Sequence, residues 1–172
     1  MGRDKALLPF HGGLLAEAIA RVVSGAAGNA TLVGDPERYG ALGYPVIRDL
    51  YPGEGPLGGI LTALQHSASD WNLITACDMP QLDAVMLRCL IDATAELDAD
   101  ALLPLGPSGR LEPLCALYHR RSLGPLNEAF SGGIRKIAAA LETVRTMRLP
   151  VAEVSLFQNV NTPEDWAGHA AG

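Results

Sequence analysis

Short apolar runs alternate along the chain with longer stretches whose apolar residues recur at helical spacing. The runs predicted as strands are 30–33, 45–48, 71–76, 101–105, 113–119, 144–149 and 153–156. The stretches predicted as helices are 14–23, 37–42, 60–67, 83–97, 122–130 and 134–142. This alternation is typical of an α/β domain built on a mostly parallel sheet.

Several positions mark how these elements begin and end. Residues 71–76 form a near-continuous apolar run, which predicts a central strand buried on both faces. Gly25 and Gly28 are predicted to end the first helix. Residues 51–59 are too rich in glycine and proline for regular structure, so we expect a loop that feeds the next helix. Thr162 is predicted to cap a last helix.

The length and charge of the chain narrow the function classes. A chain of 172 residues without repeats or linkers predicts one domain, spanning residues 1–172. Its formal net charge is −6, and the chain has no run of basic residues. The sequence therefore argues against a protein that binds nucleic acids or anionic membranes. If the ligand is a polyanion, a few placed cations or a metal must neutralise it locally.

Cysteine and histidine give no sign of a disulfide framework or a zinc site. The three cysteines are an odd number and none sits in a C-x-x-C pair, which indicates reduced thiols in a cytoplasmic protein. The four histidines are scattered without metal-ligand spacing.

Two acids stand where predicted strands end, which is where open α/β sheets bind their ligands. Asp78 follows residues 71–76 and could hold Mg²⁺, although a helix cap or turn residue is equally compatible with its position. Asp49 follows residues 45–48, and taken alone it is better explained as a turn aspartate.

Three further features could bind phosphate or a polar ligand. Gly55–Gly59 opens a helix whose N–H groups could meet an anion, although a plain Gly-Pro loop is commoner. Lys5 could neutralise phosphate or be a solvated terminal lysine. Asn159 and Asn161 are two residues apart, so both amides could face one ligand, while capping or turn duty is equally plausible.

Taken together, these segments resemble the molybdenum cofactor guanylyltransferases of MobA type, a branch of the sugar-nucleotide-type nucleotidyltransferases. M-G-R-D-K-A-L-L-P at residues 1–9 is similar to the second half of the signature A-G-G-x-S-x-R-M-G-x-D-K-x-L-L. The other matching motifs, in the family's order and spacing, are I-R-D at 47–49, G-P-L-G-G at 55–59, T-A-C-D-M-P at 75–80, L-E-P-L-C-A-L-Y at 111–118 and N-V-N-T-P-E at 159–164.

The resemblance implies a Rossmann-like, three-layer α/β/α fold of the nucleotide-diphospho-sugar transferase type. It implies transfer of GMP from GTP to the phosphate of molybdopterin, with Mg²⁺ as the cofactor. Molybdoenzyme apoproteins or their chaperones are implied as further partners.

The resemblance also gives roles to individual residues. Lys5 would meet the phosphates of GTP, and Asp78 would bind Mg²⁺ and act with Lys5 in catalysis. Asp49 would lie in the nucleotide pocket, together with Gly55, Pro56 and Leu57 on the guanine and ribose side. The remaining pair, Asn159 and Asn161, would lie on the acceptor or metal side.

Two departures from the family pattern leave alternatives open. The chain starts at the Met of the signature, so we expect a domain truncated at its N-terminus, without the family's first strand and Gly-rich loop. Gly34 replaces a polar residue that many relatives carry after the second strand. The alternatives are a molybdopterin cytidylyltransferase, another small nucleotidyltransferase, or a catalytically dead protein that binds the cofactor.

Overall fold

The computed structural model describes residues 4–152 and 155–159, and its largest sheet has four strands in the order β5–β7–β6–β8. These strands are β5 (Trp71–Thr75), β6 (Ala101–Leu105), β7 (Cys115–His119) and β8 (Thr146–Pro150). Two smaller sheets consist of β1 (Pro9–Phe10) with β2 (Gly13–Leu14) and of β3 (Leu32–Val33) with β4 (Val46–Ile47).

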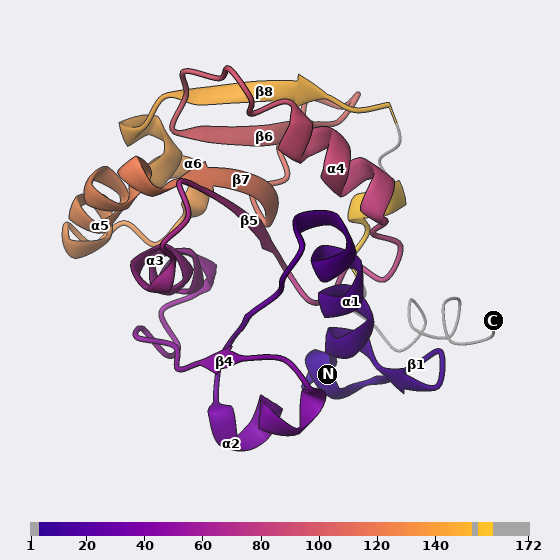
Figure 1. Ribbon diagram of the computed structural model, residues 1–172. Coiled ribbons are helices and arrows are strands. Elements are labelled where there is room, and N and C mark those ends of the chain that lie inside the picture. The colour runs from indigo at the N-terminus through magenta and orange to yellow at the C-terminus, as the bar shows by residue number, and fades with distance from the viewer. Residues whose placement is uncertain (1–3, 153–154, 160–172) are drawn as a thin grey trace.

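Helices lie on both sides of the four-stranded sheet (Figure 1). The α-helices are α1 (Leu15–Ala27), α2 (Pro36–Tyr39), α3 (Pro56–His66), α4 (Ala84–Asp92), α5 (Leu123–Ser131) and α6 (Ile137–Ala140). The 3-10 turns are η1 (Lys5–Leu7), η2 (Gly40–Leu42), η3 (Arg120–Ser122), η4 (Leu141–Thr143) and η5 (Ser155–Phe157). None of the helices in the described part of the chain is long and apolar enough to span a membrane.

Alternation along β6 and β7 divides the core into two layers. Ala101 and Leu103 pack in one buried cluster with residues of α3, α5 and α6. Leu102 points to the opposite face and packs in a second cluster with residues of α1 and α4. Successive side chains of a strand face opposite sides, so this period places one helical layer on each face. The predicted three-layer arrangement is therefore confirmed.

The predicted parallel direction holds for some strand pairs only. β3 is parallel to β4 and β6 is parallel to β8, whereas β7 is antiparallel to both β5 and β6. Residues 106–114 connect β6 to β7 without a helix, and a parallel crossover needs a longer connection. The short connection therefore turns the chain back on itself and reverses β7.

Three helices have boundaries that differ from the predicted ones, and local interactions explain the differences. Gly25 lies inside α1, and Gly28 ends that helix with a φ of 83°. Pro56 occupies the first turn of α3, so that helix begins four residues before its predicted start at residue 60. The predicted helix 83–97 ends at Asp92, and the hydroxyl of Thr94 donates to the carbonyl of Ile91. Such a bond offers the backbone an alternative to the helical pattern.

The C-terminal predictions have mixed outcomes. The strand predicted over 153–156 is wrong in its second half, because residues 155–157 form the turn η5. This turn places the Phe157 side chain in a buried hydrophobic cluster. The helix predicted after Thr162 lies outside the described residues.

The strand β5 differs from its predicted environment. Each of its five residues is half-buried, whereas the first four residues of β6 and of β7 are buried. β5 pairs with β7 on one side, and its other edge has no strand partner among residues 4–152 and 155–159. The prediction of a strand buried on both faces is therefore wrong, because β5 is an edge strand of the sheet formed by the described residues.

We expect amide hydrogen exchange to reveal this open edge. The amide of Ala76 donates to the carbonyl of Leu114, and the amide of Arg120 donates to the carbonyl of Asp70. In an antiparallel pair bonded and non-bonded positions alternate, so Ile74 points its amide toward β7 and Leu73 points its amide to the open edge. Leu73 should exchange faster than Ile74 by on the order of a hundredfold.

Exchange measured by NMR on the whole chain tests this expectation residue by residue. Equal protection of Leu73 and Ile74 would show that another segment covers the edge of β5.

Candidate functional site

Lys5 and Asp78 meet where the N-terminal turn packs against the segment that leaves β5. The Lys5 Nζ lies 3.4 Å from Asp78 Oδ2. Lys5 opens η1, which is capped by Asp4 through a 3.1 Å hydrogen bond from the amide of Ala6. Asp78 follows the last residue of β5 by three positions. The structure thus brings together two residues that are 73 positions apart in the sequence.

The carboxylate of Asp78 is only partly satisfied. Its Oδ2 faces Lys5, while Oδ1 is buried and has no hydrogen-bond partner among the described residues. A buried carboxylate oxygen is costly unless a donor or a cation compensates its desolvation. Asp78 therefore has the chemistry of a ligand for a hard divalent cation, which prefers carboxylate oxygens together with phosphate oxygens and water.

Cys77 precedes Asp78 and remains a neutral thiol. Burial, and after it the negative charges of Asp78 and Asp4, raise the pKa of Cys77 to about 11. A thiol with this pKa is protonated near neutral pH and is therefore a poor nucleophile. Asp78 and Lys5 thus remain the groups of this segment that can act on phosphate.

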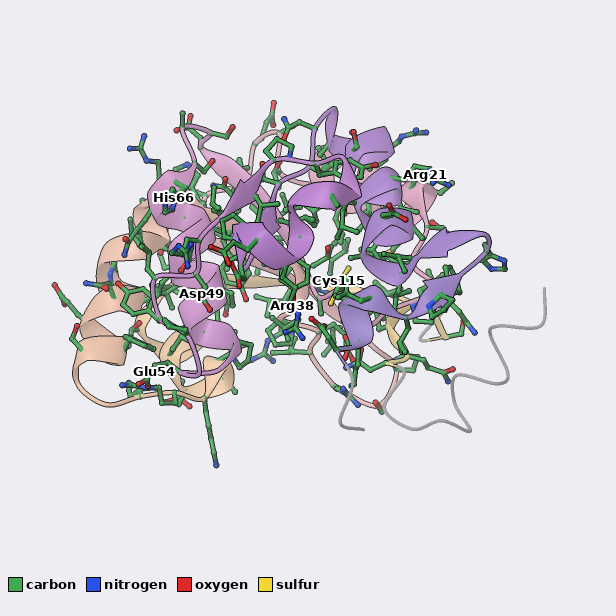
Figure 2. All side chains as sticks on the ribbon, turned by 90° about the horizontal axis from the view of Figure 1, so that it is seen from below. Arg21, Arg38, Asp49, Glu54, His66 and Cys115 are labelled. Carbon is green, nitrogen blue, oxygen red and sulfur yellow. The ribbon has the colours of Figure 1, made fainter. Side chains whose placement is uncertain are left out.

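Asp49 supports the loop that leads into α3. Its Oδ1 accepts hydrogen bonds from the amide of Tyr51 at 2.9 Å and from the hydroxyl of Thr62 at 3.1 Å. The same Thr62 hydroxyl accepts from the amide of Leu50. This arrangement matches the turn role that the sequence left open for Asp49. Figure 2 shows Asp49 beside α3, with Arg38 closer to the middle of the view.

The Gly-Pro segment is the start of a helix and not a free loop. Gly55 caps α3 with a φ of 84°, a conformation that favours glycine, and Pro56 follows it in the first turn. The side chain of Leu57 is fully buried in the core. Leu57 as a whole residue is 0% exposed, so the exposed residues Gly55 and Pro56 are the part of this segment that a ligand can reach.

The two asparagines near the C-terminus have different outcomes. Asn161 lies outside the described residues. Asn159 Oδ1 is buried without a hydrogen-bond partner in the described part of the chain. Asn159 follows Phe157, which packs in the same buried cluster as Met79, the residue after Asp78. Both segments therefore border the same buried cluster.

No group of three His, Cys, Asp or Glu side chains converges on a common point within residues 4–152 and 155–159. Protein side chains of this part of the chain therefore form no complete metal cage. Such an incomplete set is what Mg²⁺ uses when a substrate phosphate and water supply its remaining ligands.

Sequence reasoning missed several polar residues around Lys5. Asp4 Oδ2 accepts a 2.6 Å hydrogen bond from the hydroxyl of Tyr39 and lies 3.2 Å from Arg38 Nε. Asp4 directly precedes Lys5 in the matching motif at residues 1–9. This position is the one sequence feature that could have indicated a role for Asp4. Nothing in the sequence links Tyr39 or Arg38 to Asp4, because 35 residues separate Tyr39 from it.

Glu112 is a second missed acid. It is 8% exposed, and its Oε1 lies 2.9 Å from Arg110 Nε. Burial raises the pKa of Glu112, and the charge of Arg110 opposes this shift. Because Ala76 pairs with Leu114, Glu112 lies at the same end of the sheet as Asp78.

The layered fold, with Lys5 and Asp78 paired where β5 ends, defines an α/β domain of the class that binds ligands beyond the carboxyl ends of its strands. Residues 1–145 match the family model for the MobA-like NTP transferase domain. The chain belongs to this family and is a nucleotidyltransferase. The fold and family that the sequence motifs implied are thereby confirmed.

Individual relatives agree with this assignment. A probable molybdenum cofactor guanylyltransferase from Nostoc sp. is 37% identical over 175 residues, which cover 97% of this chain and 83% of that protein. One from Carboxydothermus hydrogenoformans is 38% identical over 74% of this chain, and the match spans 63% of that protein.

A solved structure is also similar. The crystal structure of molybdopterin-guanine dinucleotide biosynthesis protein A from Archaeoglobus fulgidus superimposes with a TM-score of 0.82 at 28% identity. The superposition covers 98% of this chain and 90% of that chain.

Proposed function

We propose that this chain is a single domain that transfers GMP from GTP to the phosphate of molybdopterin in the cytoplasm, with Mg²⁺ as its cofactor. The products are the guanine dinucleotide form of the cofactor and pyrophosphate. The observation that carries the proposal is the pair of Lys5 and Asp78, in which Asp78 Oδ1 is buried without a partner. Named relatives support the choice of GTP and molybdopterin.

Lys5 and Asp78 take complementary parts in this reaction. The ammonium of Lys5 binds and orients the phosphates of the nucleotide. Asp78 would hold Mg²⁺, and Asn159 is a second candidate ligand, because each has a buried Oδ1 without a hydrogen-bond partner in the described part of the chain. A bound Mg²⁺ polarises phosphate oxygens and neutralises the negative charge that develops during transfer.

The negative net charge of the chain explains why nucleotide binding needs Lys5 and a metal ion at Asp78. With a net charge of −6, the protein as a whole repels a nucleoside triphosphate. A local cation and a divalent metal are needed to reverse that repulsion at one place.

The chain needs no nucleophile of its own for this transfer. A phosphate oxygen of molybdopterin attacks the α-phosphorus of GTP, the bond to the β-phosphate oxygen breaks, and pyrophosphate leaves. A phosphate monoester is already ionised near neutral pH, so no strong base is required. The work of the protein is therefore positioning and charge stabilisation.

The start of α3 supports the nucleotide side of the site. The exposed residues Gly55 and Pro56 supply the ligand-facing wall, and Leu57 anchors this helix start in the core. Asp49 holds the preceding loop against Thr62. Molybdoenzyme apoproteins or their chaperones are the partners that would receive the finished cofactor.

The base preference tests this function against its closest alternatives. We expect GTP to be used more efficiently than CTP or ATP by about 10⁴-fold, because a site that hydrogen-bonds one base leaves polar groups unpaired with another. Competition between radiolabelled GTP, CTP and ATP, with Mg²⁺ and molybdopterin present, measures this ratio. Equal or better use of CTP would assign the chain to the cytidylyl branch, and binding of molybdopterin without any transfer would indicate a cofactor-binding protein.

A further inference from the structure

The turn that carries Lys5 is fixed by polar contacts of the preceding residue. η1 contains three residues, too few to hold its own conformation, so tertiary contacts decide where it lies. Buried Ala6 anchors the turn beside Tyr39 in a small cluster. Asp4 accepts a hydrogen bond from the amide of Ala6 on Oδ1 and another from the hydroxyl of Tyr39 on Oδ2. These contacts determine how the turn is rotated and where Lys5 points.

Tyr39 is the stronger of the two side chains that hold Asp4. Its hydroxyl lies 2.6 Å from Asp4 Oδ2, whereas Arg38 Nε lies at 3.2 Å with 56% of its side chain exposed. Ion pairs with exposed partners contribute little because water screens them. Burial, and then the hydrogen bond to Asp4, raise the pKa of Tyr39 to about 12, so the phenol keeps its proton and remains a donor.

Gly34 makes room for the Tyr39 ring. A Cβ at Gly34 would lie 2.5 Å from Tyr39 Cε2 and 2.8 Å from Cδ2, which is closer than real contacts allow. The amide of Gly34 donates to the carbonyl of Ile47 at 2.9 Å, so the backbone is tied to β4 and is not free to retreat. The ring of Tyr39 therefore occupies the space that a side chain at position 34 would need.

We propose that Tyr39 is a positioning residue for Lys5. Its hydroxyl fixes Asp4, Asp4 fixes the turn η1, and Gly34 is the position that lets the Tyr39 ring reach Asp4. This inference rests on the proposed function in that Lys5 is taken to bind nucleotide phosphate. It adds a residue of α2, together with the glycine after β3, to the machinery of the site.

A double-mutant cycle between Tyr39→Phe and Lys5→Gln tests the proposal. Tyr39→Phe keeps the ring and removes the hydroxyl. We expect it to weaken Mg²⁺-GTP binding by about tenfold, the size of one hydrogen bond to a charged group. In the Lys5→Gln background, Tyr39→Phe should weaken Mg²⁺-GTP binding by less than about twofold. The effects of two substitutions are not additive when one residue acts through the other. Tyr44→Phe, outside the site, is the matched control and should leave binding unchanged.

Glycine substitutions provide a second route that leaves Tyr39 itself in place. Gly34→Ala should displace the ring and reproduce the loss seen with Tyr39→Phe. Gly40→Ala is the matched control, because a Cβ at Gly40 meets nothing within 4 Å. Thermal melting of each variant reports whether it is folded.

A readout without nucleotide separates this inference from the proposed function. Limited acetylation followed by mass spectrometry compares Lys5 with Lys136, the other lysine of the chain, within one sample. We expect Tyr39→Phe to raise the reactivity of Lys5 several-fold relative to Lys136, whichever nucleotide the protein uses. Unchanged Lys5 reactivity, or an equal loss of binding in both Lys5 backgrounds, would overturn the role of Tyr39. Failure of the proposed function would appear separately, as binding of another nucleotide by the unmodified protein.

Discussion

We expect the replacement of Asp78 by Asn to cause a large loss of nucleotidyl transfer while leaving the domain folded. The change keeps the size of the side chain and removes the negative charge beside Lys5. An amide is a much weaker ligand for Mg²⁺ than a carboxylate, and an amide nitrogen cannot coordinate it. We expect kcat to fall by about 10²–10³-fold, the loss typical when one electrostatic contact to the reacting group is removed.

The measurement is transfer of labelled GMP under saturating Mg²⁺, with thermal melting as the test of folding. Asp92→Asn is the matched control, because Asp92 is exposed at the end of α4. Transfer by Asp78→Asn at a rate close to that of the unmodified protein would remove Asp78 from the metal site.

The helical layers of this fold could be predicted because their signals are local. The apolar period and helix propensity of residues 14–23 are enough to indicate α1. The helix predicted over 37–42 is present as α2, which begins one residue earlier at Pro36. Boundaries were less certain where one residue suits two structures. Pro56 fits a loop as well as a first helical turn, and the sequence alone does not decide between them.

The environment of β5 could not be predicted because it depends on neighbours far away in the chain. Its apolar sequence is that of a strand buried on both faces, yet each of its residues is half-buried. Burial of a strand is a property of the sheet around it. The short connection before β7 similarly reversed a strand that the alternating pattern indicated as parallel.

In the candidate site, too, local sequence signals could be predicted and contacts between distant residues could not. Lys5 and Asp78 could be selected because one lies in a motif and the other at a strand end, and the structure places them 3.4 Å apart. The contact between Tyr39 and Asp4 has no counterpart in any local pattern. It arises because Gly34 leaves space for an aromatic ring, which only the folded chain reveals.

Replacing Lys5 by Gln should weaken nucleotide binding and transfer together. Glutamine keeps much of the length and polarity of the side chain but removes its positive charge. In a protein with a net charge of −6, that loss leaves Asp4 and Asp78 facing the phosphates with one cation fewer. We expect kcat/KM for GTP to fall by about 10²–10³-fold, since charge stabilisation is the main contribution asked of this site.

Lys136→Gln is the matched control for this change, because it removes the same charge from an exposed position before α6. Both variants lower the net charge equally, so a loss confined to Lys5→Gln isolates the position of the charge from its amount. Raising the ionic strength weakens long-range attraction in all variants alike. If Lys5 contacts phosphate directly, the kcat/KM of Lys5→Gln stays below that of Lys136→Gln at high ionic strength. Equal kcat/KM values for Lys5→Gln and Lys136→Gln would show that Lys5 acts only through the overall field of the protein, and the phosphate-binding role would have to be given up.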